Sequence, residues 1–121
     1  MRNEVFRFLR MLANRSYPEI DESFDLDQMF PEAKWKYTEL GNVMEVYYTT
    51  HEWIRLDPAA RNKVNTKITE SEDRKSWLIE QTLVDPEELN DFQMVFNLSI
   101  QNAKETGVVK LVPLELRSIA G

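Results

Sequence analysis

The sequence predicts a single-domain α+β fold, in which a β-hairpin and a C-terminal edge strand pack against about four helices. Three patterns lead to this expectation: an amphipathic helical repeat opens the chain, two alternating runs flank Gly41-Asn42, and an apolar run containing Pro113 closes it. A length of 121 residues suits one domain. An apolar fraction of 42% and an aromatic fraction of 11% indicate a chain that folds rather than one that stays disordered.

The first element expected is an amphipathic helix over residues 3–15. Its apolar residues recur at i, i+3, i+4 and i+7 and comprise Val5, Phe8, Leu9 and Leu12. Arg7 and Arg10 fall on the opposite face, where they either bind an acidic partner or phosphate or are simply solvated. Four arginines against Glu4 give residues 1–16 a charge of +3, so the rest of this chain of net charge −6 carries −9. The arginines also interrupt the apolar run that a signal peptide requires.

An acidic connector is expected over residues 16–32, because Pro18 ends the helical pattern and Pro31 disfavours regular structure. Four apolar residues lie among its acids and either dock onto a partner or cover the domain's own core: Phe24, Leu26, Met29 and Phe30. The spacing of the acids imitates a calcium loop, but that loop needs glycine where Leu26 stands. We therefore expect no metal site in the connector.

A β-hairpin is expected over residues 33–56. Two alternating runs flank Gly41-Asn42, and glycine at the first central position permits a type II′ turn. Lys34–Tyr37 interleaves cations with aromatic rings, as do surfaces that bind single-stranded nucleic acid. On an alternating strand, however, both rings share one face, which is typical of a half-buried strand. The acidic balance of the chain also disfavours nucleic acid as a partner.

Helices are expected between residues 57 and 106. Asp57-Pro58 and Asp85-Pro86 each place an N-cap residue before a proline at the first helical position. The last helix would span residues 86–105 and end at Gly107. It carries one apolar stripe for the core and a second apolar face, which comprises Met94, Val95 and Leu98. This second face either packs between two layers of its own domain or contacts another chain.

The last element expected is a strand over residues 108–118. Because Pro113 cannot donate a ladder hydrogen bond, this strand is expected at an edge of the sheet. No internal repeat or linker indicates a second domain.

Residue types that carry catalysis are scarce. The chain has no cysteine, which excludes cysteine nucleophiles and thiolate metal sites. His51 is the single histidine, and Arg55 occupies the position where a zinc-protease motif needs a second one. The three glycines form no phosphate-binding loop. We therefore expect a protein that is not an enzyme, with no catalytic residue, no metal ligand and no cofactor.

The leading functional hypothesis is a non-enzymatic protein–protein interaction or assembly subunit, such as a structural component of a phage or secretion particle. It depends on the scarcity of catalytic residues, on the second apolar face of the 86–105 helix, and on the separation of basic from acidic segments. The expected partners are other protein subunits, copies of itself included. A membrane is not expected, because no apolar run approaches ~20 residues. The expected location is the cytoplasm or a particle assembled inside the cell.

Two alternatives stay open. One is a small acidic inhibitor or immunity-type protein that masks a basic nucleic-acid-binding surface, with Phe24, Leu26 and Phe30 as anchors. Its binding would weaken steeply with salt, whereas that of an obligate apolar interface would not. The other is a small hydrolase with His51 as general base, whose activity would disappear in His51→Ala.

Overall fold

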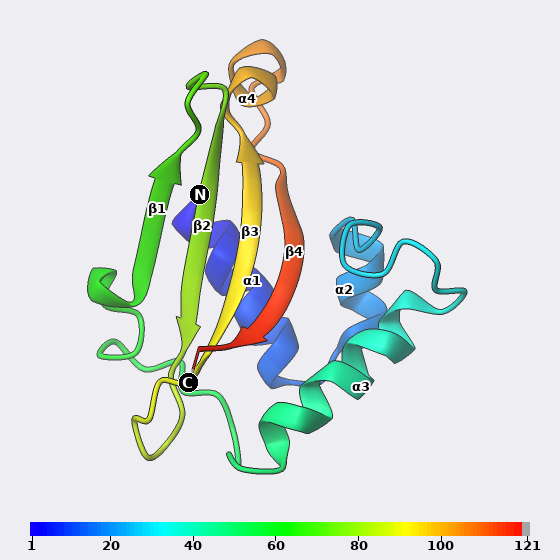
Figure 1. Cartoon of the computed structure of the whole chain (residues 1–121), viewed down its shortest axis with the longest axis vertical. Coiled ribbons are helices and arrows are strands. Elements are labelled where there is room, and N and C mark those ends of the chain that lie inside the picture. The colour runs from blue at the N-terminus through cyan, green and yellow to red at the C-terminus, as the bar shows by residue number, and fades with distance from the viewer. Residues whose placement is uncertain (120–121) are drawn as a thin grey trace.

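Four helices and a four-stranded antiparallel sheet make up the fold of residues 1–119, which are the residues described by this computed structural model (Figure 1). This arrangement confirms the predicted α+β class. The helices are α1 (Arg2–Ala13), α2 (Tyr17–Ser23), α3 (Lys36–Tyr48) and α4 (Ile100–Thr106). The strands are β1 (Thr66–Glu70), β2 (Ser76–Leu83), β3 (Phe92–Ser99) and β4 (Leu111–Ser118). A short 3-10 turn, Lys63–Asn65, precedes β1.

The sheet follows the chain order β1-β2-β3-β4, and each neighbouring pair is antiparallel. β4 therefore lies at an edge, as Pro113 predicts. Pro113 is paired with Phe96, next to a shift in register between Val95 and Phe96. A proline is tolerated there because an edge strand has one side free and a bulge interrupts the ladder.

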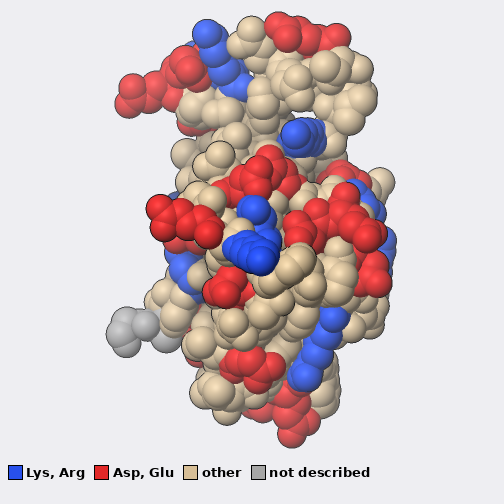
Figure 2. Space-filling view, turned by 90° about the vertical axis from the view of Figure 1, so that its right-hand side faces the viewer, with Lys and Arg blue, Asp and Glu red and all other residues tan. Residues whose placement is uncertain are grey.

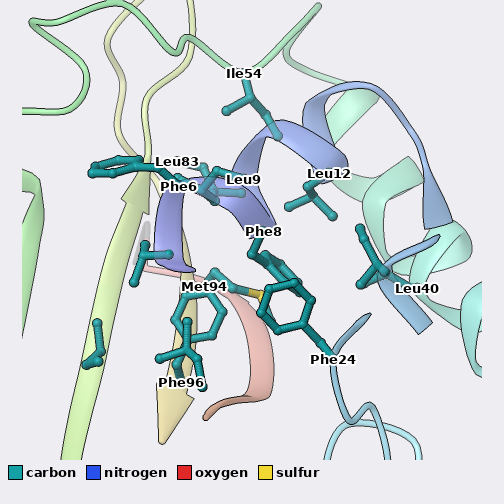
Figure 3. Packing of buried hydrophobic residues seen from close by; sticks show 14 of the residues in the cluster. Phe6, Phe8, Leu9, Leu12, Phe24, Leu40, Ile54, Leu83, Met94 and Phe96 are labelled. Carbon is teal, nitrogen blue, oxygen red and sulfur yellow. The ribbon is translucent and has the colours of Figure 1, made fainter. Parts of the chain in front are cut away.

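α1 crosses one face of the sheet and supplies much of the core (Figure 1). The apolar stripe predicted for residues 3–15 is confirmed, because Val5, Phe8, Leu9 and Leu12 are all buried. The Phe8 ring stands edge-on to two other rings, with centroids 5.1 Å from both Phe24 and Phe96 (Figure 3). Edge-to-face contacts of this kind fix the position of α1 over β3.

The segment predicted as a hairpin, 33–56, is instead dominated by α3, so that prediction is wrong in its placement. Leu40, Met44 and Tyr47 recur at helical spacing and form the buried stripe of α3. Gly41 is not a turn residue: it lies within α3, where an added Cβ would approach the Tyr17 ring to 3.2 Å. Glycine therefore permits the close approach of α2 and α3. Lys34–Tyr37 leads into this helix and does not alternate as a strand.

The connector 16–32 is also more regular than predicted. Pro18 does not stop helical structure, since it lies in the first turn of α2, where its missing N–H costs nothing. A single turn then follows, closed by the Phe30 N–H donating to the Leu26 carbonyl at 3.0 Å.

The regular structure of residues 57–106 consists of β1, β2, β3, a 3-10 turn and the short α4, so the helices predicted there are wrong except at the end. The predicted 86–105 helix is replaced by a loop, β3 and the short α4. Met94, Val95 and Phe96 are consecutive and all buried, because β3 is an interior strand covered on both faces. The sequence of a strand that is apolar on both faces resembles that of a buried helix, and the periodicity of apolar residues alone does not distinguish the strand from the helix. Gly107, at φ 71°, ends α4 as predicted.

None of the helices formed by residues 1–119 combines the length and the apolar character needed to cross a membrane.

Candidate functional site

His51 lies just beyond the C-terminal end of α3, and its ring is almost completely buried, with 1% of the residue exposed. Its backbone N–H donates to the Tyr47 carbonyl at 3.0 Å, which continues the last turn of the helix. The rings of Tyr47 and Phe92 flank the imidazole, with centroids 4.9 and 5.9 Å away. These aromatic walls fix the ring and keep water from its faces.

The loop between β2 and β3 faces this imidazole and is organised around one buried carboxylate. Asp85 is fully buried and accepts hydrogen bonds from three backbone N–H groups, those of Glu87, Leu89 and Asn90, at 2.8 to 3.2 Å. Glu88 and Asn90 adopt positive φ angles of 57° and 52°. Such backbone is sparsely populated outside glycine and is held by surrounding contacts. The loop is therefore a fixed structure rather than a loose connection.

Three carboxylates of this loop converge on the two ring nitrogens of His51. Asp91 Oδ1 lies 2.8 Å from Nε2. On the other side, Nδ1 lies 3.5 Å from Asp85 Oδ2 and 3.7 Å from Glu87 Oε2. Nδ1 is buried and has no hydrogen-bond partner among the described residues. We call His51, Asp85, Glu87 and Asp91 the His51 site.

The electrostatics of the site favour an ionised Asp85. Burial raises the pKa of Asp85, but the Asn90 and Leu89 N–H groups and the His51 ring outweigh burial, and the pKa is lowered from its ordinary value. Burial, together with the charges of Asp85 and Asp91, raises the pKa of Tyr47. Tyr47 therefore stays neutral, and its hydroxyl donates to the Trp53 carbonyl at 2.8 Å.

The His51 site is the one place among the described residues where three metal-ligating side chains converge. One ligand atom from each of His51, Asp85 and Glu87 lies within 4.8 Å of the others. A buried imidazole beside carboxylates can hold a cation, bind a proton, or orient as a base. Sequence reasoning missed this site: it interpreted Asp85 as a helix cap and His51 as isolated. The sequence signal was the density of acids in Asp85–Asp91, but nothing local links that loop to His51.

A second feature is the outer edge of β1, which no strand among the described residues pairs with. Lys67, Ile68, Thr69 and Glu70 are exposed along it. Beside this edge lies a hollow of about 350 Å³ whose lining residues are Met1, Arg2, Lys63, Thr66 and Ile68. The Arg61 carbonyl accepts a hydrogen bond of 2.6 Å from Arg2, so Arg61 lies next to a residue that lines the hollow. We call this strand edge with its hollow the β1 edge.

The apolar residues predicted to bind a partner are mostly covered by the chain itself. Phe24 and Leu26 belong to the buried core, and Met29 and Phe30 pack against it. Met94, Val95 and Leu98 are buried in β3, with at most 3% exposed. The connector therefore covers its own domain, and the second apolar face assigned to a helix is not a surface.

The two candidate arginines of α1 differ in their surroundings. Arg7 forms an ion pair of 3.0 Å with Glu4 and lies over the Phe24 ring at 4.6 Å, whereas Arg10 is exposed. On the face in Figure 2, acidic and basic side chains are interspersed. The charge separation seen along the sequence therefore does not become two opposed patches on that face.

Residues 1–116 match the family model described as Domain of unknown function (DUF3516), and the chain belongs to this family. No curated protein and no solved structure matches the chain.

Proposed function

We propose that this chain is a non-enzymatic protein–protein interaction module, which binds an extended acidic segment of another protein subunit along the β1 edge. The observation that carries this proposal is an exposed strand edge that no other described strand pairs with, beside a hollow lined by Arg2 and Lys63. In this proposal the chain works inside the cell as a subunit of a larger assembly, which the absence of cysteine suits.

The backbone of β1 supplies the general part of the recognition. An edge strand presents a row of N–H and C=O groups that an extended peptide pairs with, so that the sheet gains one strand. Four of the five residues of β1 are exposed, and so a fifth strand meets little obstruction from side chains. Pairing of this kind is independent of the peptide's sequence, so specificity must come from side chains.

The hollow supplies a place for an apolar side chain of the bound segment. Ile68 is 43% exposed and lines the hollow together with Met1. Side chains of a strand alternate between two faces, so every second residue of the segment would point toward this hollow. We therefore expect the bound segment to alternate apolar with acidic residues.

The charges of the β1 edge determine the sign of the partner. The cations near it are Arg2, Arg61, Lys63 and Lys67, in a chain whose net charge is −6. Acidic side chains opposite these groups form favourable cross-strand pairs, and like charges are unfavourable there.

A pair of synthetic peptides tests the proposal. Peptides of about eight residues that alternate Glu with Val, or Lys with Val, are titrated into ¹⁵N-labelled protein. We expect the acidic peptide to shift the amide resonances of β1, to bind more weakly as salt rises, and to bind better than the basic peptide. The double variant Lys63→Glu/Lys67→Glu should bind the acidic peptide about tenfold more weakly.

The matched control is Lys104→Glu/Lys110→Glu, which makes the same change in net charge at exposed positions outside the β1 edge. It should bind the acidic peptide as the parent protein does. Equal binding of the two peptides, or shifts confined to other parts of the sheet, would overturn the proposal.

A further inference from the structure

We propose that the His51 site binds one divalent transition-metal ion, with zinc as the best fit, through His51 Nδ1, Asp85 and Glu87. The proposal is independent of the β1 edge and concerns the loop that follows β2. It begins from His51 Nδ1, a buried nitrogen that lies beside two carboxylates and has no hydrogen-bond partner within residues 1–119.

The hydrogen bond to Asp91 decides which ring nitrogen is free. The carboxylate oxygen of Asp91 acts as the acceptor in this contact of 2.8 Å, so it is Nε2 that carries the hydrogen. In the neutral ring Nδ1 then has a lone pair and no hydrogen. This lone pair lies beside the oxygens of Asp85 and Glu87, which are acceptors as well. A metal ion between these three atoms turns the arrangement into an attraction, and so would a proton on Nδ1; the experiments below separate the two.

The spacing of the three atoms suits a small ion. Tetrahedral zinc with bonds of about 2.0–2.1 Å separates its ligand atoms by about 3.3–3.5 Å. His51 Nδ1 lies 3.5 Å from the Asp85 oxygen and 3.7 Å from the Glu87 oxygen. The three ligand atoms are all within 4.8 Å of one another. The side chain of Glu87 is 54% exposed, so it can rotate to close the remaining edge.

The surroundings match what a bound metal requires. A ligating histidine commonly donates its other N–H to a carboxylate, which orients the ring and makes it a better ligand, and Asp91 occupies that position. The Asp85 carboxylate accepts hydrogen bonds from three backbone N–H groups, which fix its position before any ion binds. A nitrogen ligand favours zinc or its neighbours over calcium and magnesium, which prefer oxygen alone. The exposed Glu87 provides the route from solvent.

Such an ion would join the end of α3 to the loop before β3. These segments are far apart in sequence, and the metal would cross-link them where the aromatic rings of Tyr47 and Phe92 already pack on His51. The expected role is therefore structural, and its loss should loosen the 85–91 loop before it affects the sheet.

The test uses protein stripped with a chelator and titrated with Zn²⁺ by calorimetry. We expect one ion per chain, and about tenfold or weaker binding in Glu87→Gln, which removes a ligand from an exposed position without disturbing the core. Glu88→Gln is the matched control, because Glu88 is the next residue, is also a glutamate, and is paired with Arg55 outside the site. Its zinc affinity should equal that of the parent.

Nitrogen-detected NMR of the His51 ring provides a second readout. Zinc should move the Nδ1 resonance to a metal-bound value and leave the hydrogen on Nε2. Two results would overturn the proposal: equal zinc affinity in the parent and Glu87→Gln, or a ring that carries hydrogens on both nitrogens and does not change when zinc is added. In the second case the site would be a buried ion pair and not a metal centre.

Discussion

Asp91 Oδ1 and His51 Nε2 lie 2.8 Å apart although 40 residues separate them in the chain. This contact joins a residue in the segment that follows α3 to the residue just before β3. It therefore couples the helical layer to the sheet at a position where no regular secondary structure connects them. Removal of this hydrogen bond should lower the free energy of unfolding, whether or not the His51 site binds an ion.

Asp91→Ala should lower the free energy of unfolding by about 1–3 kcal/mol, because it leaves the buried Nε2–H of His51 without its acceptor. Urea unfolding followed by circular dichroism measures this loss. Asp91→Asn is the control, since its side-chain oxygen still accepts the hydrogen bond, and it should lose less. Equal losses in the two variants would show that the charge, and not the hydrogen bond, stabilises the contact.

Tyr17 should make the protein sensitive to alkali. Burial, with a smaller effect from Tyr48, raises the pKa of Tyr17 from 10.0 to about 12. A group whose folded pKa is above its unfolded one contributes stability that is complete below the unfolded pKa and is lost as the pH rises toward the folded one. Stability should therefore fall between about pH 10 and pH 12.

Tyr17→Phe should make this alkaline fall shallower, with the remainder due to Tyr47 and Tyr48, whose pKa values are also raised by burial. At neutral pH the variant should be at least as stable as the parent, because the Tyr17 hydroxyl is buried without a partner among the described residues. Thermal unfolding across this pH range checks both statements. A steeper fall in Tyr17→Phe would contradict the assignment.

Gly41→Val should destabilise the protein by about 1–3 kcal/mol, because the new side chain would overlap the Tyr17 ring where α2 and α3 touch. Asn42→Val is the control: it introduces the same side chain at the next residue of α3, which is exposed, and should cost only about 0.5 kcal/mol. The comparison also separates α3 from the predicted hairpin, in which Gly41 would be an exposed turn residue. Equal costs would argue against the α2–α3 contact.

The sequence predicts well those elements whose signals are local. α1 shows its buried stripe directly, Pro113 indicates an edge strand, and Gly107 marks the end of α4. The sequence predicts a hairpin where α3 forms, because the Val, Tyr and Thr residues of this segment favour strands. In the structure, burial of Leu40, Met44 and Tyr47 along one face stabilises the helix instead. Tertiary packing overrides propensity in such a segment.

The His51 site could not be predicted for a different reason. It is assembled by contacts between segments that are distant in the chain, and each segment has an ordinary local interpretation. Asp85-Pro86 resembles a helix start, yet the carboxylate organises a loop by accepting three backbone N–H groups instead. Only the fold shows that this loop encloses the single histidine.

Phe24 provides the sharpest test of whether the acidic connector binds a partner or covers the core. It is 6% exposed and edge-on to Phe8 at 5.1 Å. Phe24→Ala should therefore lower the free energy of unfolding by about 3–5 kcal/mol in the isolated protein. Trp35→Ala is the control, because Trp35 is 57% exposed and its loss should change stability little. If Phe24 served to bind a partner, Phe24→Ala would leave the free energy of unfolding unchanged and weaken only the binding. Chemical unfolding of the two variants therefore distinguishes the two roles.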